Sequence, residues 1–181
     1  GRVHAANVTD FQSAVMRTTS LATCKLLQDV GLEPVLQMTG RDRNRIAIQG
    51  EMLSAGVFGI NNMLALTGDH TVVGDHPQAK GVFDLDCVGI LQTAETLMKG
   101  TDLVGNSLKG SPEFYLGASV TPRYTPLELQ ILKMQKKINA GAKFFQTQGV
   151  YDIETMREFR EATKHMDCKI LAGIIPFKTT G

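Results

Sequence analysis

The stretch LALTGD, residues 64–69, passes from aliphatic residues to a threonine, a glycine and a carboxylate. Aliphatic residues that end in polar ones are typical of a buried strand in a parallel sheet, whose carboxyl end presents functional groups. Asp69 would then stand as a single negative charge at a strand end. The same residues also fit a plain turn or a helix N-cap, because aspartate after glycine is common in turns. Asp69 is therefore a candidate functional residue with a structural alternative.

Polar side chains also follow the other apolar runs, which lie at 2–8, 33–39, 113–120, 142–148 and 169–175, beside the run at 62–68. The carboxyl ends of parallel strands share one face, so these side chains should gather there. The set is rich in amides and hydroxyls and poor in charge, which suits a flat heteroaromatic ligand such as a flavin or a pterin. Its members are Asn7, Thr9, Asp10, Gln37, Thr39, Arg41, Asp42, Thr67, Gly68, Asp69, Ser119, Thr121, Arg123, Gln146, Thr147, Gln148, Pro176 and Lys178. Gln148 taken alone also fits a solvated amide at a strand end.

Segments with helical spacing of apolar residues separate these runs. The segments 18–31, 126–141 and 151–166 are the clearest, with Gly31 and Gly141 as helix-ending residues and Asp152 as an N-cap. The expected buried stripes are Leu21, Cys24, Leu27 and Val30 in the first segment, and Leu127, Ile131, Met134 and Ile138 in the second.

Strands that alternate with helices predict an α/β fold with a parallel sheet and right-handed crossovers. Six strands and five helices can be counted along the 181 residues. A doubly wound sheet is complete with six strands, whereas a (β/α)₈ barrel needs two more and about 250 residues. No G-x-G-x-x-G motif follows the first strand, which weakens the dinucleotide-binding alternative. The pattern by itself leaves both architectures open.

Composition excludes several other classes. The formal net charge of +1 gives no electrostatic basis for binding nucleic acid or an acidic membrane surface. No run approaches about 18 apolar residues, so no membrane span is expected. Cys24, Cys87 and Cys168 are scattered and odd in number, which indicates buried thiols in a reducing cytoplasm rather than a disulfide or zinc framework. The repeated GDH at 68–70 and 74–76 lacks the spacing that would fix a metal.

A cluster of lysines lies on the segment KMQKK, residues 133–137. Lys133, Lys136 and Lys137 fit a solvated helix face. They also fit contact with a phosphate or diphosphate, if the helix flanks the face where the strands end.

Three segments together resemble the methylenetetrahydrofolate reductases: NNMLALTGDH (61–70), INAGAKFFQTQGVYDIETM (138–156) and ILAGIIPF (170–177). They occur in the order and spacing of that family, and the resemblance covers residues 2–178. The family fold is a (β/α)₈ TIM barrel that binds a flavin at the carboxyl ends of its strands. The resemblance therefore implies that residues 1–181 are a partial TIM-barrel domain, covering about strands two to seven.

The resemblance also implies roles for individual residues. Asp69 matches an aspartate beside the flavin that faces the folate, where it favours the cationic iminium form and tunes the flavin. Gln148 matches a glutamine that hydrogen-bonds the pterin. The cofactor-binding set is Asn7 and Gln37 on the flavin, Thr67, Gly68 and Asp69 near its ring system, Asp84 and Ser119 along its tail, and Lys133, Lys136 and Lys137 at the diphosphate. No metal is implied. Asn7, Gln37, Ser119 and Gln130 depart from the family pattern, so FAD is expected and FMN stays open.

The implied activity is the flavin-dependent reduction of 5,10-methylenetetrahydrofolate to 5-methyltetrahydrofolate in one-carbon metabolism. Electrons would come from NAD(P)H or a partner protein, and the protein would act in the cytoplasm as a homo-oligomer or with an electron-transfer subunit. The family's general-acid glutamate belongs to the first strand, which has no counterpart here, and we expect the intact protein to be longer by roughly a third. Two alternatives remain: a flavin-free pterin-binding TIM-barrel methyltransferase, and a non-catalytic barrel subunit.

Overall fold

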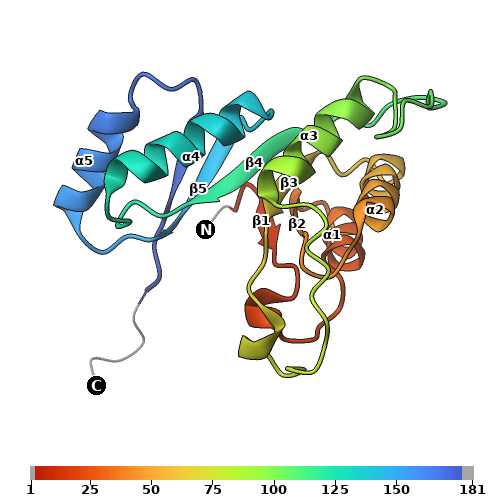
Figure 1. Cartoon of the computed structure of the whole chain (residues 1–181), viewed down its shortest axis with the longest axis horizontal. Coiled ribbons are helices and arrows are strands. Elements are labelled where there is room, and N and C mark those ends of the chain that lie inside the picture. The colour runs from red at the N-terminus through yellow and green to blue at the C-terminus, as the bar shows by residue number, and fades with distance from the viewer. Residues whose placement is uncertain (1–2, 177–181) are drawn as a thin grey trace.

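A computed structural model of the chain, which describes residues 3–176, has alternating strands and helices throughout (Figure 1). The predicted positions Phe177 and Lys178 lie outside the described residues. The elements follow the predicted order: β1 Ala6–Val8, α1 Ser20–Asp29, β2 Pro34–Thr39, α2 Arg45–Val57, β3 Asn62–Leu66, α3 Cys87–Met98, β4 Tyr115–Val120, α4 Leu127–Asn139, β5 Phe144–Gly149, α5 Ile153–Thr163 and β6 Lys169–Gly173. Two short 3₁₀ turns, η1 Gln12–Ala14 and η2 Thr71–Val73, lie in the loops after β1 and β3.

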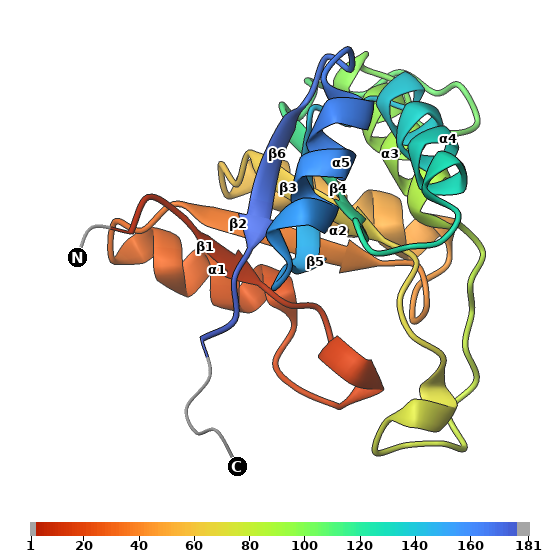
Figure 2. The same cartoon turned by 90° about the vertical axis from the view of Figure 1, so that its left-hand side faces the viewer.

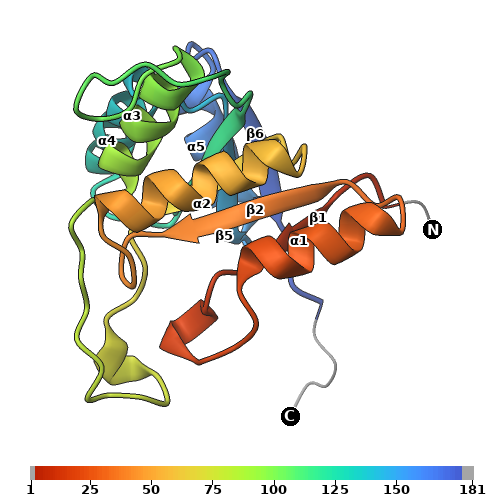
Figure 3. The same cartoon turned by 90° about the vertical axis from the view of Figure 1, so that its right-hand side faces the viewer.

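The strands form one parallel sheet in the order β1-β2-β3-β4-β5-β6. Right-handed crossovers between strands in sequential order place every helix on the same face, and the helices do lie along the outside of the sheet (Figures 2 and 3). The sheet is curled, as a half-barrel is: the Asn7 amide donates to Gln146 Oε1 at 2.8 Å, although β1 and β5 are not neighbours. The α/β class and the parallel sheet are thus confirmed.

The two faces of the sheet differ in polarity because side chains alternate along each strand. Leu36, Met38, Met63 and Phe145 point toward the helices and join the hydrophobic core, where each is 0% exposed. The intervening residues line the concave face and include several polar groups. Polar members of that face include Asn7, Gln37, Ser119 and Gln146, beside Leu64 and Phe144.

The helix ends follow the predicted capping residues. Asp152 accepts from the backbone N–H groups of Glu154 and Thr155, and Gly31 and Gly141 adopt positive φ after α1 and α4. One position of the predicted stripe is wrong. Val30 is 78% exposed, because α1 ends at Asp29 and Val30 itself forms the C-cap.

Within the described part of the chain, no helix is long and apolar enough to cross a membrane.

The loop that enters α3 presses on the end of β2 at Gly40. A Cβ built on Gly40 would lie 2.0 Å from the Leu85 carbonyl oxygen, which belongs to the backbone and cannot rotate away. This close approach brings α3 against the strand ends. Only glycine is accommodated at this position.

We therefore predict that Gly40→Ala lowers the free energy of unfolding by about 1–3 kcal/mol through overpacking. The matched control is Gly50→Ala in the interior of α2, where no atom lies within 4 Å of the added Cβ. It should raise stability by about 0.5–1 kcal/mol through helix propensity. Urea unfolding monitored by far-UV circular dichroism measures both. An equal effect of the two substitutions would contradict the predicted contact.

Candidate functional site

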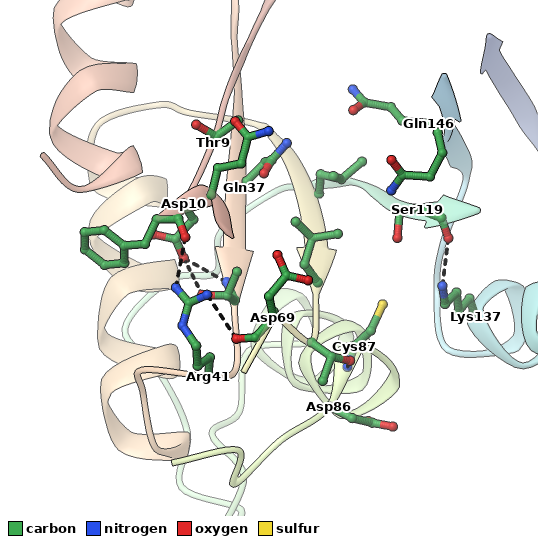
Figure 4. A pocket seen from close by; sticks show the side chains of 18 of the residues that line it. Thr9, Asp10, Gln37, Arg41, Asp69, Asp86, Cys87, Ser119, Lys137 and Gln146 are labelled. Atoms are coloured by element: carbon green, nitrogen blue, oxygen red, sulfur yellow. Dashed lines mark hydrogen bonds between the residues drawn. The ribbon is translucent and has the colours of Figure 1, made fainter. Parts of the chain in front are cut away.

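A cavity of about 880 Å³ opens where strands β1 to β5 end (Figure 4). This volume lies in the range of small-molecule and cofactor sites. Its lining combines amides, hydroxyls and charges with a few aliphatic groups. The lining residues are Thr9, Asp10, Phe11, Gln12, Ser13, Gln37, Thr39, Arg41, Leu64, Leu66, Thr67, Gly68, Asp69, Asp86, Cys87, Val88, Ser119, Lys133, Lys136, Lys137, Gln146, Thr147 and Gln148.

The turn after β3 presents Asp69 at the floor of this cavity. Gly68 has φ +94°, a left-handed conformation that suits glycine, and a Cβ on it would press on Arg41 and Thr39. The Asp69 side chain is exposed and points into the space between Gln37 and Ser119 (Figure 4). Thr67 Oγ1 accepts from the backbone N–H of Cys87 at 3.1 Å, which joins the turn to the start of α3. Among the described residues, the Asp69 carboxylate has no hydrogen-bond or ion-pair partner, while its backbone carbonyl accepts from Arg41.

Another wall of the cavity carries three lysines. Lys137 Nζ donates to the Ser119 carbonyl oxygen at 2.7 Å, which anchors α4 to the end of β4. Lys133 Nζ lies 4.6 Å from the centre of the Tyr124 ring, within cation–π range. Lys136 completes the lining of this wall. The three ammonium groups give one side of the cavity an affinity for anions.

Strand β5 contributes two amides near its end. Gln146 is half-buried, and its Oε1 accepts from Asn7. Gln148 is exposed and lies where the pairing of β5 with β6 shifts in register between Gln146 and Gly149. This irregularity leaves the Gln148 amide at the cavity.

The structure brings most of the predicted site residues together, and two of them do not line the cavity. Those that do are Gln37, Thr67, Gly68, Asp69, Ser119, Lys133, Lys136, Lys137 and Gln148. Asn7 is exposed and is not among the lining residues, and its side-chain amide donates to Gln146 Oε1. Asp84 pairs with the Arg45 guanidinium at 2.8 Å and accepts from the Arg45 backbone N–H, so it serves the start of α2. Neither residue lines the cavity, and their contact with a cofactor stays a prediction.

A buried ion network at the cavity was not foreseen. Asp10 is 2% exposed and accepts from Arg43 Nη1 at 2.7 Å, from the Thr39 backbone N–H at 2.8 Å and from the Thr39 hydroxyl at 2.9 Å. Arg43 also binds Glu51 on α2. The network joins the ends of β1 and β2 to α2. In the sequence, the network is visible only as an aspartate after β1 and an arginine after β2. No local pattern indicates that these two residues form a pair.

Two groups near the cavity show how burial changes acidity. Burial raises the pKa of Glu51, although the Arg43 charge opposes this. Burial raises the pKa of Cys87 to about 11, and its thiol donates to the Ala65 carbonyl oxygen. Cys87 is therefore a neutral wall group at physiological pH rather than a nucleophile.

The GDH repeat has ordinary local roles. His70 Nδ1 accepts from the Val72 backbone N–H, and His76 pairs with Asp75 at 2.9 Å. Across residues 3–176, no group of three or more histidine, cysteine or acidic side chains is placed to hold a metal ion.

Comparison with known proteins gives a family and a fold. The family model described as methylenetetrahydrofolate reductase matches residues 2–181. Two crystal forms of 2,3-dimethylmalate lyase, a PEP mutase/isocitrate lyase superfamily member, resemble the chain with TM-scores of 0.57 and 0.56 at 11% and 10% identity. The alignments cover 87% and 85% of this chain and 52% and 51% of those chains, so the chain spans about half their length. At this identity the likeness concerns the fold alone.

The Asp84–Arg45 pair generates a prediction about acid stability. The hydrogen bond from Arg45 lowers the pKa of Asp84 from 3.8 to about 2. A carboxylate with a lowered folded-state pKa stabilises the fold above its unfolded pKa, and this contribution is lost as the pH falls from 3.8 toward about 2.

We therefore predict that Asp84→Asn has a flatter dependence of the thermal midpoint on pH across that window than the parent protein. Arg45→Met removes the same interaction from the other side and should flatten the curve to a similar extent. Parallel curves for the parent and both variants would show that the pair contributes nothing.

Proposed function

Since the chain belongs to the methylenetetrahydrofolate reductase family, we propose that it forms the flavin- and folate-binding part of an enzyme that reduces 5,10-methylenetetrahydrofolate to 5-methyltetrahydrofolate. The curled parallel sheet would supply strands two to seven of a (β/α)₈ barrel. Its helices lie outside and its cavity lies at the strand ends, as in such barrels. The observation that carries the proposal is the cavity itself, with the free Asp69 carboxylate at its floor and lysines on one wall.

The cavity has the chemistry that a flavin nucleotide requires. Its aliphatic groups, Leu64, Leu66 and Val88, can contact a flat ring, and the amides of Gln37, Gln146 and Gln148 can hydrogen-bond its heteroatoms. Lys133, Lys136 and Lys137 would neutralise a phosphate or diphosphate, which favours FAD and accommodates FMN. A bound flavin would supply a hydride to the methylene carbon of the folate, after its own reduction by NAD(P)H or by electrons from a partner protein.

Asp69 would act on the substrate by its charge. Opening of the folate's five-membered ring produces a cationic iminium, and a fixed carboxylate beside it stabilises that cation without reorganisation. Gln148, exposed at the end of β5, would hydrogen-bond the pterin and orient it. Gly68 fixes the backbone that carries Asp69.

Ring opening also needs a proton on the bridging nitrogen. Among the described residues, the cavity carboxylates are Asp10, Asp69 and Asp86. Asp10 is held by Arg43, and Asp86 accepts from the Gly89 backbone N–H as the N-cap of α3. We therefore propose that the proton comes from a group other than these three. We also propose that the protein acts in the cytoplasm, and that it assembles with copies of itself or with an electron-transfer subunit.

The first test is the visible absorption spectrum of the full-length native protein. We expect the bands of an oxidised flavin, and we expect them to bleach when 5-methyltetrahydrofolate is added. A colourless protein that takes up neither FAD nor FMN would overturn the flavin proposal. Pterin binding without flavin would then favour a methyl-transferring barrel, and binding of neither would favour a non-catalytic subunit.

A second prediction concerns Asp69→Asn in the flavin-loaded protein. Loss of the charge should slow oxidation of the reduced flavin by methylenetetrahydrofolate on the order of 100-fold, while flavin affinity changes little. Stopped-flow absorbance measures the rate, and titration measures the affinity. Asp86→Asn is the matched control, since asparagine also caps helices, and it should slow the reaction far less. Comparable losses of rate and affinity in Asp69→Asn would contradict the assigned role.

A further inference from the structure

A buried arginine underlies the turn that presents Asp69. Arg41 follows β2 and is 2% exposed, although a guanidinium remains charged at every physiological pH. We propose that Arg41 is the positioning residue of Asp69: it fixes the backbone of the Asp69 turn, and so aims the carboxylate that acts on the folate. The action of Asp69 on folate rests on the proposed function, whereas the restraint of the Asp69 turn by Arg41 does not.

The Arg41 guanidinium bridges two loops by hydrogen bonds to one backbone carbonyl in each. Nη1 donates to the Asp69 carbonyl oxygen at 3.2 Å, and Nη2 donates to the Phe11 carbonyl oxygen at 3.1 Å. Nε and Nη2 also donate to the two carboxylate oxygens of Asp42, at 2.9 and 2.7 Å. Asp42 therefore balances the charge and fixes the plane of the guanidinium, and the remaining donors point at the two backbone carbonyls (Figure 4).

Asp69 depends on this backbone contact because its side chain has no partner of its own. Within residues 3–176, its carboxylate makes no hydrogen bond and no ion pair. The side chain is therefore aimed by the backbone alone. Gly68, at φ +94°, sets the turn, and its Cα packs against Arg41, where an added Cβ would lie 3.0 Å from Arg41 Cβ. Arg41 thus restrains the turn by hydrogen bond and by contact.

The hydrogen bond from Arg41 Nη2 to the Phe11 carbonyl restrains the loop after β1. Phe11 has φ 49° and ψ 52°, a left-handed conformation that a bulky residue adopts only under restraint. Its loop meets the loop of Asp69 beyond the cavity, where a Cβ on Gly74 would lie 1.9 Å from the Ala14 carbonyl oxygen. Asp75 accepts from the Met16 backbone N–H in the same region. Arg41 therefore joins two loops that form one side of the cavity.

Arg43 provides the contrast. It is also a buried arginine, two residues further along, but its guanidinium binds Asp10 and Glu51 and lies 5.8 Å from the centre of the Phe11 ring; within residues 3–176 it makes no hydrogen bond to the Asp69 turn. Loss of Arg43 should weaken the fold as a whole. Loss of Arg41 should loosen the Asp69 turn specifically. Comparing variants of the two arginines therefore distinguishes a positioning role from a general structural role.

The first arm of the test is hydrogen exchange and needs no ligand. In the full-length protein, Arg41→Lys keeps the charge but cannot reach both carbonyls and Asp42 together. We expect the backbone N–H groups of Val73 and Gly74, which bond to His70 and Thr71 carbonyl oxygens, to exchange about tenfold faster. In Arg43→Lys, the exchange rates of these two N–H groups should stay close to those of the parent protein, once the change in global stability has been taken into account. Equal acceleration in both variants, or none in Arg41→Lys, overturns the inference.

The second arm is a double-mutant cycle in the flavin-loaded protein. Arg41→Lys should slow flavin oxidation by saturating methylenetetrahydrofolate at least tenfold, and should have little further effect when Asp69 is already asparagine. Full additivity of the two substitutions would overturn the claim that Arg41 acts through Asp69. If the parent protein binds no flavin, the proposed function fails, and the exchange arm still decides whether Arg41 fixes the turn.

Discussion

The ion pair between the buried Asp10 carboxylate and Arg43 is the interaction on which the fold around the strand ends depends. A lone buried charge is costly, and here Arg43 and the Thr39 backbone and hydroxyl satisfy it together. The pair ties the loop after β1 to the end of β2, and Glu51 extends it to α2. Arg41, two residues before Arg43, makes a separate set of contacts that holds the turn after β3. The Asp10 network therefore joins the ends of β1 and β2 to α2, and Arg41 joins the end of β2 to the turn after β3.

A second constraint is the division of the sheet into two faces. The residues that face the helices are apolar and form the core, so they provide the stability of the fold. The concave face is free to carry amides and hydroxyls, because the curl of the sheet encloses a cavity rather than a packed interior. Gln37 and Ser119 lie on this face without weakening the core. Along each strand, the residues that stabilise the core thus alternate with the residues that line the cavity.

Much of the fold could be read from local pattern. Within residues 3–176, the six strands and the three helices with predicted ranges lie near those ranges, since apolar spacing and capping residues are local signals. Val30 was misplaced because periodicity does not mark the last turn of a helix. The choice between a doubly wound sheet and a curled one was beyond pattern, since both contain the same alternation of elements. The sequential strand order and the Asn7–Gln146 bond come from the three-dimensional structure.

The site divides in the same way. The sequence by itself determined that polar groups end the strands, because parallel strands deliver their carboxyl ends to one face, and Asp69 and Gln148 do line the cavity there. Only the tertiary structure decided which charges are free to act and which are used to hold the fold. Asp84 and Asp10 are both paired with arginines, whereas Asp69 has its backbone held and its carboxylate free. That difference arises from contacts between loops distant in sequence, which no local spacing records.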